Sequence, residues 1–153
     1  DVYKRQSPFI DRSAEEYGLR TAMTAKSVVA QTKRVPAGQG VSYGYLHRTA
    51  GESTLALIPV GYAEGLPRDA TGSAQVSIRG RRYTILARIA MDQFVIDCGD
   101  DEVEVGDEVI IFGDPTLDVP SADSWARACG TINYEIVTRM GGRFKRRYLG
   151  EVQ

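Results

Sequence analysis

Short apolar runs alternate with turn residues along most of the chain, which is the pattern of a β-rich fold. From about Leu19 onwards the runs are broken by glycine and proline at near-regular spacing. Strands are predicted in a mixed run at 22–35 that ends at the turn 36–38, and in runs at 54–60, 76–78, 83–85, 94–96 and 109–112. The run at 54–60 is apolar throughout, as in a strand buried on both faces. Arg79-Gly80 predicts the turn of a hairpin.

The last third of the chain changes to a helical period. Ser121 is placed to cap a first helix and Gly130 to end it. A second helix is predicted from Thr131 to Met140 because its apolar positions follow the helical period. The segment 143–152 is then expected to return as a strand. We therefore predict a mainly β fold class: a small β-barrel or sandwich-like domain with a short helical pair inserted before the last strand.

The beginning of the chain differs from the rest. Its first six residues, DVYKRQ, read as the translation of a transposon end used in preparing sequencing libraries. Residues 1–6 are therefore expected to be a sequencing or cloning scar, with a natural charged tail as the alternative. Residues 7–20 are expected to be the remnant of a linker, and 21–153 a single domain.

Composition excludes several classes of protein. The chain has 153 residues, 42% of them hydrophobic and 25% charged, which is typical of one globular domain. A net charge of −1 gives no overall attraction for nucleic acid, and no apolar run approaches the roughly 18 residues that span a bilayer. We expect a cytoplasmic protein with no nucleic-acid or membrane partner. The basic run at 143–147 is expected to form a solvated strand face with surface ion pairs.

The cysteines and the single histidine do not form a recognisable metal site. Cys98 and Cys129 lack the C-x-x-C spacing, and His47 is the one histidine of the chain. A zinc site needs more ligands than these, so no metal is expected. Both cysteines are expected to be buried or half-buried thiols.

Four segments together resemble the alanine racemase family: VSYGY at 41–45, PVGYAEGLPR at 59–68, RIAMDQF at 88–94 and TINYEIV at 131–137. One such segment occurs by chance, but four in the family's order make a specific resemblance. It implies the C-terminal β-domain of an enzyme whose TIM barrel binds pyridoxal 5′-phosphate through a lysine. Lys26 and Lys33 do not match that lysine, so it is expected to lie outside this chain. The chain alone is accordingly expected to be inactive.

The resemblance assigns roles to two tyrosines. Racemisation removes a proton from Cα on one face and returns one on the other, so it needs two acid/base groups. The resemblance implies that the cofactor lysine is one and that Tyr43 is the other, acting on the barrel of the partner in a head-to-tail homodimer. Tyr134 matches the residue that hydrogen-bonds the cofactor phosphate, and the start of a helix favours an anion. The alternatives are an aromatic residue beside a turn for Tyr43 and a core residue for Tyr134.

Further matches would line the path of the substrate. Met91 and Asp92 match the site for the substrate carboxylate, through the backbone N–H of Met91, and Tyr62 would form a narrow gate with Tyr43. The entryway matches are Arg68, Arg88 and Ile132. Core, turn and solvated-surface roles are the alternatives for Met91, Asp92 and the two arginines.

The function implied is interconversion of L-alanine and D-alanine for cell-wall precursors, by an amino-acid racemase (an isomerase). The domain would contact the barrels of its own subunit and of a second one. Two alternatives stay open: a non-catalytic β-barrel interaction module, and a racemase of serine or of a broad range of amino acids. Without its barrels, the domain is expected to expose an apolar, tyrosine-rich patch.

Overall fold

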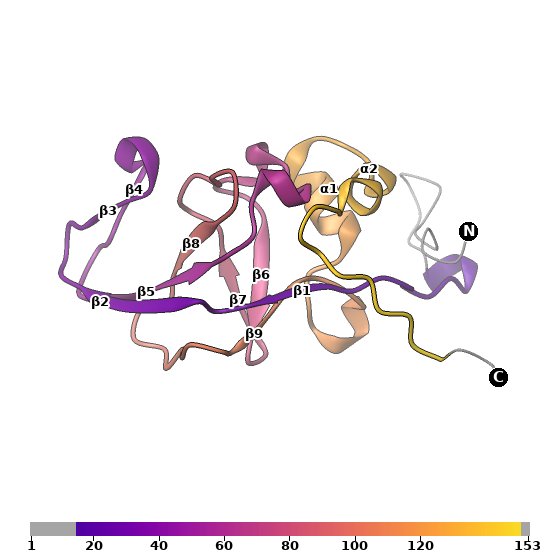
Figure 1. The fold of residues 1–153 in the computed structure, drawn as a ribbon, viewed down its shortest axis with the longest axis horizontal. Helices are drawn as coiled ribbons and strands as arrows, with labels where there is room; N and C mark the ends of the chain where they lie inside the picture. The colour runs from indigo at the N-terminus through magenta and orange to yellow at the C-terminus, as the bar shows by residue number, and fades with distance from the viewer. Residues whose placement is uncertain (1–14, 151–153) are drawn as a thin grey trace.

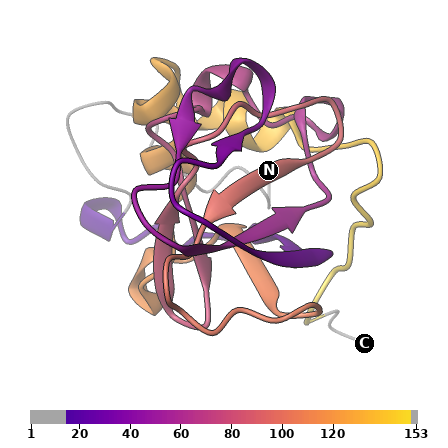
Figure 2. The ribbon, with the colours of Figure 1, turned by 90° about the vertical axis from the view of Figure 1, so that its left-hand side faces the viewer.

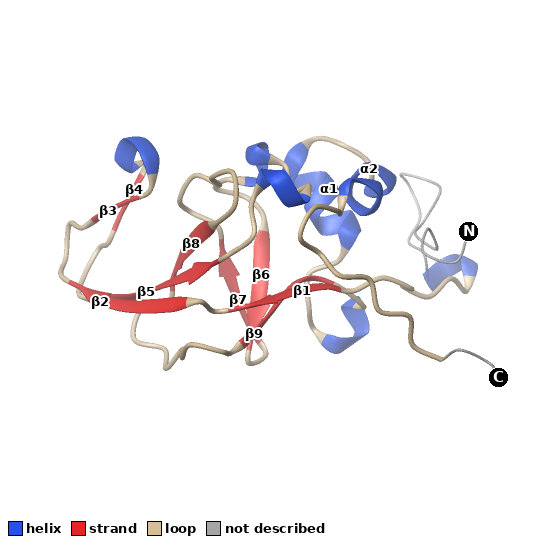
Figure 3. Cartoon of the chain, viewed as in Figure 1, coloured by secondary structure: helices blue, strands red, loops and turns tan. Residues whose placement is uncertain are grey.

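The computed structural model describes residues 15–150, which form a mainly β domain (Figure 1, Figure 3). The expected scar at 1–6 and residues 7–14 of the expected linker lie outside the described residues. Within residues 15–150 there are three antiparallel sheets and two α-helices, and the sheets do not close into a barrel. The predicted fold class is confirmed. None of the helices in this range has the length and apolar character to cross a bilayer.

The largest sheet has four strands in the order β1-β9-β6-β7. These are β1 (Ala25–Val28), β9 (Glu108–Phe112), β6 (Gln75–Ile78) and β7 (Arg81–Thr84). Strands β6 and β7 form the predicted hairpin, and both residues of its turn, Arg79 and Gly80, have positive φ, at 49° and 76°. This conformation suits the twist of a two-residue hairpin loop.

The second sheet has the order β2-β5-β8, from β2 (Gln31–Val35), β5 (Ser53–Ile58) and β8 (Phe94–Asp97). The run at 22–35 thus holds two strands that belong to different sheets. The expectation that the run at 54–60 is buried on both faces is wrong. Ala56 and Ile58 are fully buried, whereas Leu55 and Leu57 are partly exposed, because only one face of β5 meets the core.

A two-stranded arm projects from the second sheet. Strands β3 (Gly40–Val41) and β4 (His47–Arg48) pair with each other, and the 3-10 turn η2 (Tyr43–Tyr45) joins them. We call residues 38–49 the β3–β4 arm, because Gly38 and Thr49 close its base through a backbone hydrogen bond of 2.7 Å. Figures 1 and 2 show this arm rising from the β2–β5 end of the molecule, with η2 at its tip.

The two predicted helices are present and pack against each other. Helix α1 (Ala122–Cys129) begins at the N-cap Ser121 and ends at Gly130, which has a left-handed conformation. Helix α2 (Asn133–Arg139) follows directly. The buried Trp125 joins α1 to the sheet, because its indole N–H donates to the carbonyls of Gln75 at 3.0 Å and Ile111 at 2.7 Å. The remaining 3-10 turns are η1 (Glu15–Tyr17), η3 (Tyr62–Glu64), η4 (Arg68–Ala70) and η5 (Pro115–Leu117).

The strand expected at 143–152 is not formed over residues 143–150. This segment runs past β1 without joining a sheet (Figure 1). It is attached to the domain by the side chain of Arg143, which donates to the carbonyls of Pro59 and Asp92. A strand needs backbone hydrogen bonds to a neighbouring strand, and within residues 15–150 this segment pairs neither with β1 nor with any other strand.

Candidate active site

The tip of the β3–β4 arm presents Tyr43 to solvent. The side chain of Tyr43 is 70% exposed. The residue before it, Ser42, donates its hydroxyl to the backbone carbonyl of Arg88 at 2.8 Å. The guanidinium of Arg88 also lies close to Gly44, since a Cβ built there would be 3.7 Å from its Cζ. The arm therefore brings Tyr43 beside the loop that begins at Arg88.

That loop is joined to η3 through the backbone. The N–H of Tyr62 donates to the carbonyl of Ala90 at 3.2 Å, and the N–H of Ala63 donates to that of Met91 at 2.8 Å. Gly61 permits this close approach, because a Cβ on it would lie 2.3 Å from the Ala90 oxygen. Tyr62 and Met91 consequently lie next to each other, and both side chains are exposed.

The turn that carries Arg68 is joined to the same loop. Thr71, which follows η4, donates its hydroxyl to the carbonyl of Arg68 at 3.0 Å and accepts the N–H of Ile89 at 3.3 Å. The side chain of Arg68 is exposed, and that of Arg88 is half-buried.

A buried carboxylate holds the other side of η3. Glu64 is 3% exposed; it accepts the N–H of Gly61 at 2.8 Å and the Nε–H of Arg143 at 2.7 Å. The hydrogen bond from Arg143 holds the pKa of the Glu64 carboxyl below its ordinary value, although burial alone would raise it. The motifs predict neither residue for the site. Arg143 was expected on a solvated strand face with surface ion pairs. Its side chain is exposed and ion-paired, but it lies on no strand and its acidic partner is buried.

Helix α2 is tied to η3 at its C-terminal end. A Cβ on Gly65, whose φ is +104°, would lie 2.1 Å from the Arg139 carbonyl oxygen, and Gly141 donates its N–H to the carbonyl of Glu64 at 3.0 Å. Tyr134 lies five residues before Arg139, about 7.5 Å along the helix axis. Tyr134 is half-buried, and Ile132, the N-cap residue of α2, is 53% exposed.

These connections place all the residues that the motifs predict on one edge of the domain. Figures 1 and 2 both show η2, η3, η4 and α2 along the upper edge. The residues are Tyr43, Tyr62, Arg68, Arg88, Met91, Asp92, Ile132 and Tyr134. The side chains of Tyr43, Tyr62, Met91 and Ile132 are exposed. That they form one apolar, tyrosine-rich patch stays a prediction.

The tyrosine hydroxyls of this edge make no hydrogen bonds within residues 15–150. The buried Tyr83 donates its hydroxyl to Asp101 at 2.8 Å. Within residues 15–150, no hydrogen bond involves the hydroxyl of Tyr43, Tyr62 or Tyr134. All three can therefore bond to a group supplied from outside the domain.

Lys26, Lys33 and the two cysteines are not among the residues that the motifs predict for this edge. Lys26 and Lys33 lie on β1 and β2, strands that carry none of the predicted site residues, and Lys26 pairs with Glu108 at 2.8 Å. Cys98 is buried and Cys129 half-buried, and both thiols are free, as predicted. Burial raises the pKa of the Cys98 thiol to about 12.

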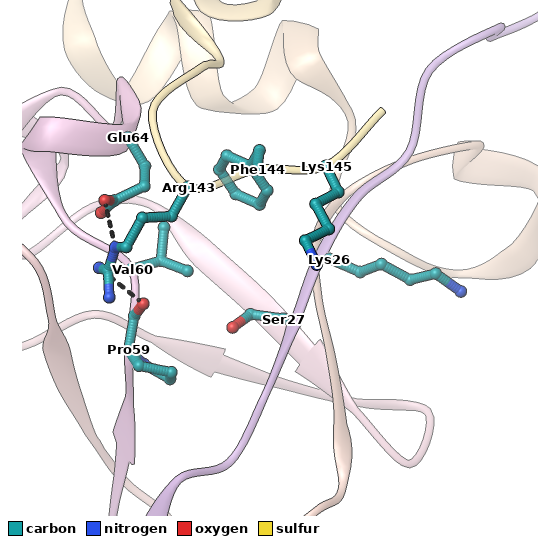
Figure 4. A pocket seen from close by; sticks show the side chains of 8 residues that line it. All are labelled: Lys26, Ser27, Pro59, Val60, Glu64, Arg143, Phe144 and Lys145. Carbon is teal, nitrogen blue, oxygen red and sulfur yellow. Dashed lines mark hydrogen bonds and ion pairs between the residues drawn. The ribbon is translucent and has the colours of Figure 1, made fainter. Parts of the chain in front are cut away.

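A hollow of about 330 Å³ lies between η3, β1 and the C-terminal segment (Figure 4). Its lining comes from β1, the stretch between β5 and η3, η3 itself and the C-terminal segment: Lys26, Ser27, Pro59, Val60, Glu64, Arg143, Phe144 and Lys145. Figure 4 shows Arg143 reaching through it to Glu64 and Pro59, while the ammonium of Lys26 points away. The hollow thus holds a structural ion pair and contains no residue that the motifs assign to catalysis.

Known proteins match this chain over most of its length. The family model described as "Alanine racemase, C-terminal domain" matches residues 22–148. The alanine racemase of Salinispora arenicola is 56% identical over 140 residues, which are 91% of this chain and 38% of that protein. The alanine racemase of Streptomyces coelicolor is 50% identical over 145 residues, 95% of this chain and 37% of that protein.

Solved structures give the same result. The alanine racemase of Streptomyces lavendulae matches with a TM-score of 0.89 and 51% identity, over 92% of this chain and 37% of its own. The biosynthetic alanine racemase of Pseudomonas aeruginosa matches with a TM-score of 0.86 and 34% identity, over 95% of this chain and 40% of its own. The chain therefore spans about two fifths of the length of these relatives.

Proposed function

The chain belongs to the alanine racemase family as its C-terminal domain, and from this we propose that it supplies one acid/base group and the substrate entrance of a pyridoxal-phosphate-dependent alanine racemase. The active site would be shared: this domain would meet the barrel of its own subunit and that of a partner in a cytoplasmic homodimer. The exposed edge that gathers the phenols of Tyr43, Tyr62 and Tyr134 is the observation that supports this role most directly.

Tyr43 would exchange a proton with the α-carbon of alanine. A phenol normally keeps its proton at neutral pH, so the base form needs cationic or hydrogen-bonding neighbours, which the barrel would provide. The arm keeps Tyr43 exposed and leaves its hydroxyl without a partner among residues 15–150. Both properties suit a group that acts on a substrate held by another polypeptide.

Met91 would bind the substrate carboxylate through its backbone. Its carbonyl accepts the N–H of Ala63, while its own N–H donates no hydrogen bond within residues 15–150. That N–H, with Asp92 beside it, is free for an incoming oxygen. Tyr62 and Tyr43 would limit the width of the gate, and the surrounding entryway would consist of Arg68, Arg88 and Ile132.

Tyr134 would contribute to holding the cofactor. Its half-buried phenol, unpaired within residues 15–150, is a suitable donor to a phosphate oxygen. The covalent attachment would come from a lysine of the barrel, since Lys26 and Lys33 lie on other elements. When bound, pyridoxal phosphate supplies the electron sink that makes the α-proton of alanine removable.

A hybrid enzyme tests the proposal. Residues 21–153 replace the corresponding domain of the Streptomyces coelicolor relative, and racemisation of L-alanine is followed by chiral chromatography. The hybrid should racemise alanine, and Tyr43→Phe should lower kcat by about 10²- to 10⁴-fold, the range for loss of an acid/base group.

The matched control is Tyr45→Phe, because Tyr45 lies in the same turn and is also 60% exposed. It should leave kcat within about twofold, since it removes a hydroxyl with no proposed role. The isolated chain should show no activity. A Tyr43→Phe hybrid as active as the parent would reject the catalytic role of Tyr43.

A further inference from the structure

The tip of the β3–β4 arm is strained on both sides of Tyr43. Ser42 has φ 58° and Tyr45 has φ 48°, although neither is glycine. Non-glycine residues in this region cost on the order of 1–3 kcal/mol each and persist only where surrounding contacts hold them. The position of Tyr43 therefore depends on what fixes the arm to the rest of the domain.

Besides the bond from the Thr49 hydroxyl to the carbonyl of Pro36 at the base of the arm, two side-chain hydrogen bonds within residues 15–150 connect the arm to the body of the domain, one on each side of Tyr43. On the N-terminal side, the hydroxyl of Ser42 donates to the carbonyl of Arg88. On the C-terminal side, Nε2 of His47, on β4, lies 2.8 Å from Oδ2 of Asp97, on β8. The side chains of His47 and Asp97 are 19% and 16% exposed, so water competes weakly for this bond.

Asp97 is a rigid acceptor. Its backbone pairs with Leu55 in the β5–β8 ladder, and its neighbours Ile96 and Cys98 are buried in the core. Its Oδ1 accepts the hydroxyl of Ser53 and the N–H of Gly99, which leaves Oδ2 for His47.

The charge of Asp97 fixes the direction of the bond to His47. Burial raises the pKa of the Asp97 carboxyl, but the hydrogen bonds from Ser53 and His47 outweigh it and hold the pKa below the ordinary value. The carboxylate can then only accept, so Nε2 of His47 carries the hydrogen.

The same three side chains do not form a hydrolytic triad. In a triad the histidine lies between the serine and the carboxylate, so that it can take the serine proton. Here Asp97 lies between Ser53 and His47, and the serine hydroxyl donates to the carboxylate. The arrangement can hold an element in place and cannot activate a nucleophile.

We propose that His47 is a positioning residue: its hydrogen bond to Asp97 holds the β3–β4 arm against β8 and so sets where the phenol of Tyr43 is presented. The consequence for catalysis rests on the proposed function of Tyr43, whereas the structural coupling does not. Without this bond, the strain at Ser42 and Tyr45 is released and the tip of the arm shifts. A misplacement of about 1 Å can cost on the order of 100-fold in rate.

Nuclear magnetic resonance on the full 153-residue chain tests the coupling. His47 is the single histidine, so its imidazole gives one set of signals, and the ring signals of Tyr43 are assigned by their loss in Tyr43→Phe. His47→Leu removes the donor and should shift the Tyr43 ring signals and speed amide exchange at Val41. His47→Gln, whose amide can still reach Asp97, should restore both. If the leucine variant does not fold, His47→Asn, which is too short to reach, replaces it.

The matched control is Asp100→Asn. Asp100 lies three residues after Asp97 and pairs with Arg34 of β2 at 2.6 Å, with no bond to the arm. It should leave the Tyr43 signals unchanged. Unchanged Tyr43 signals in His47→Leu, or no restoration by His47→Gln, would overturn the proposal.

Kinetics of the hybrid enzyme separate this inference from the proposed function. His47→Leu should lower kcat by about 10- to 100-fold with KM within about threefold, and His47→Gln should recover most of kcat. An active Tyr43→Phe hybrid would reject the proposed function and leave the resonance result standing. An inactive Tyr43→Phe hybrid beside an unaffected His47→Leu hybrid would reject the inference alone.

Discussion

Arg143 and Glu64 are 79 positions apart in the sequence, and the guanidinium Nε of one lies 2.7 Å from the carboxylate Oε1 of the other. The pair fastens the C-terminal segment to η3, the turn that carries Tyr62. Because Glu64 is buried and also caps Gly61, we expect this contact to stabilise the site edge more than the exposed ion pairs of the domain.

Glu64→Gln should lower the free energy of unfolding by about 1–3 kcal/mol at pH 7, since a charged hydrogen bond is replaced by a poorly matched amide. Urea denaturation followed by circular dichroism measures it. Glu135→Gln is the control, because Glu135 makes an exposed pair with Arg139 at 2.9 Å. It should cost no more than about 0.5 kcal/mol. Equal losses in both variants would contradict the special role of Glu64.

The Glu64–Arg143 pair also predicts how the free energy of unfolding depends on pH. The folded-state pKa of Glu64 lies below its ordinary value of 4.5, so the unfolded state binds the proton more readily. The stabilisation is therefore complete above about pH 5 and is lost as the pH falls through the folded-state pKa. The stability difference between parent and Glu64→Gln should be constant from pH 6 to pH 8 (roughly) and shrink below about pH 4.5. A difference that grows on acidification would reverse the sign and refute the assignment.

Gly61→Ala should separate η3 from the loop at 88–92. The new Cβ would lie 2.3 Å from the Ala90 oxygen and 2.4 Å from the Met91 oxygen, and both are backbone atoms. We expect this overpacking to lower the free energy of unfolding by about 1–3 kcal/mol. Urea denaturation measures the loss. Gly51→Ala is the control, because a Cβ there meets nothing within 4 Å. If both variants unfold at the same urea concentration, the close approach at Gly61 is not significant.

Trp125→Phe should weaken the attachment of the helices to the sheet. The indole N–H donates to the carbonyls of Gln75 and Ile111. Because the indole is fully buried, its replacement by the smaller phenyl ring would leave a void. A loss of about 2–3 kcal/mol is expected from the missing atoms and the unsatisfied carbonyls. Unfolding must be followed by circular dichroism, because Trp125 is the only tryptophan and the variant therefore has no tryptophan fluorescence. Tyr148→Phe, at a side chain that is 71% exposed, should have no measurable effect.

The two thiols should react at very different rates. Burial raises the pKa of Cys98 to about 12 and its side chain is 4% exposed, so the native chain should protect it from iodoacetamide at pH 7.5 (approximately). Cys129 is half-buried, and burial also raises its pKa, so it should react slowly but first. Mass spectrometry of digested protein separates the two sites. Denatured chain is the control, in which both should react alike, and early labelling of Cys98 would show that the core opens there.

Local patterns predicted the elements that local contacts form. The β6–β7 hairpin closes at Arg79-Gly80, and α1 lies between its cap at Ser121 and its stop at Gly130. In both cases the determining residues are within a few positions of the structure that they specify. The four motifs likewise identified residues that share one edge, because each motif contains its own turn.

Contacts between segments that are distant in the sequence could not be predicted from local patterns. The run at 22–35 divides between two sheets because β1 pairs with β9 and β2 pairs with β5. The β3–β4 arm has strands of two residues, too short to show an alternation. The bond between Glu64 and Arg143 could not be predicted, since nothing near Glu64 in the sequence indicates that Arg143 will reach it.

The peptide groups of Tyr62 and Ala63, rather than their side chains, bind the carbonyls of Ala90 and Met91. Replacing the side chain at 62 or 91 therefore leaves this attachment in place. In the proposed gate, variation at these two positions would widen or narrow the opening, or change its polarity, while the backbone frame around it keeps its shape. If Tyr62 and Met91 form the proposed gate, natural divergence and laboratory selection of substrate preference would have two positions at which to act with little risk to folding.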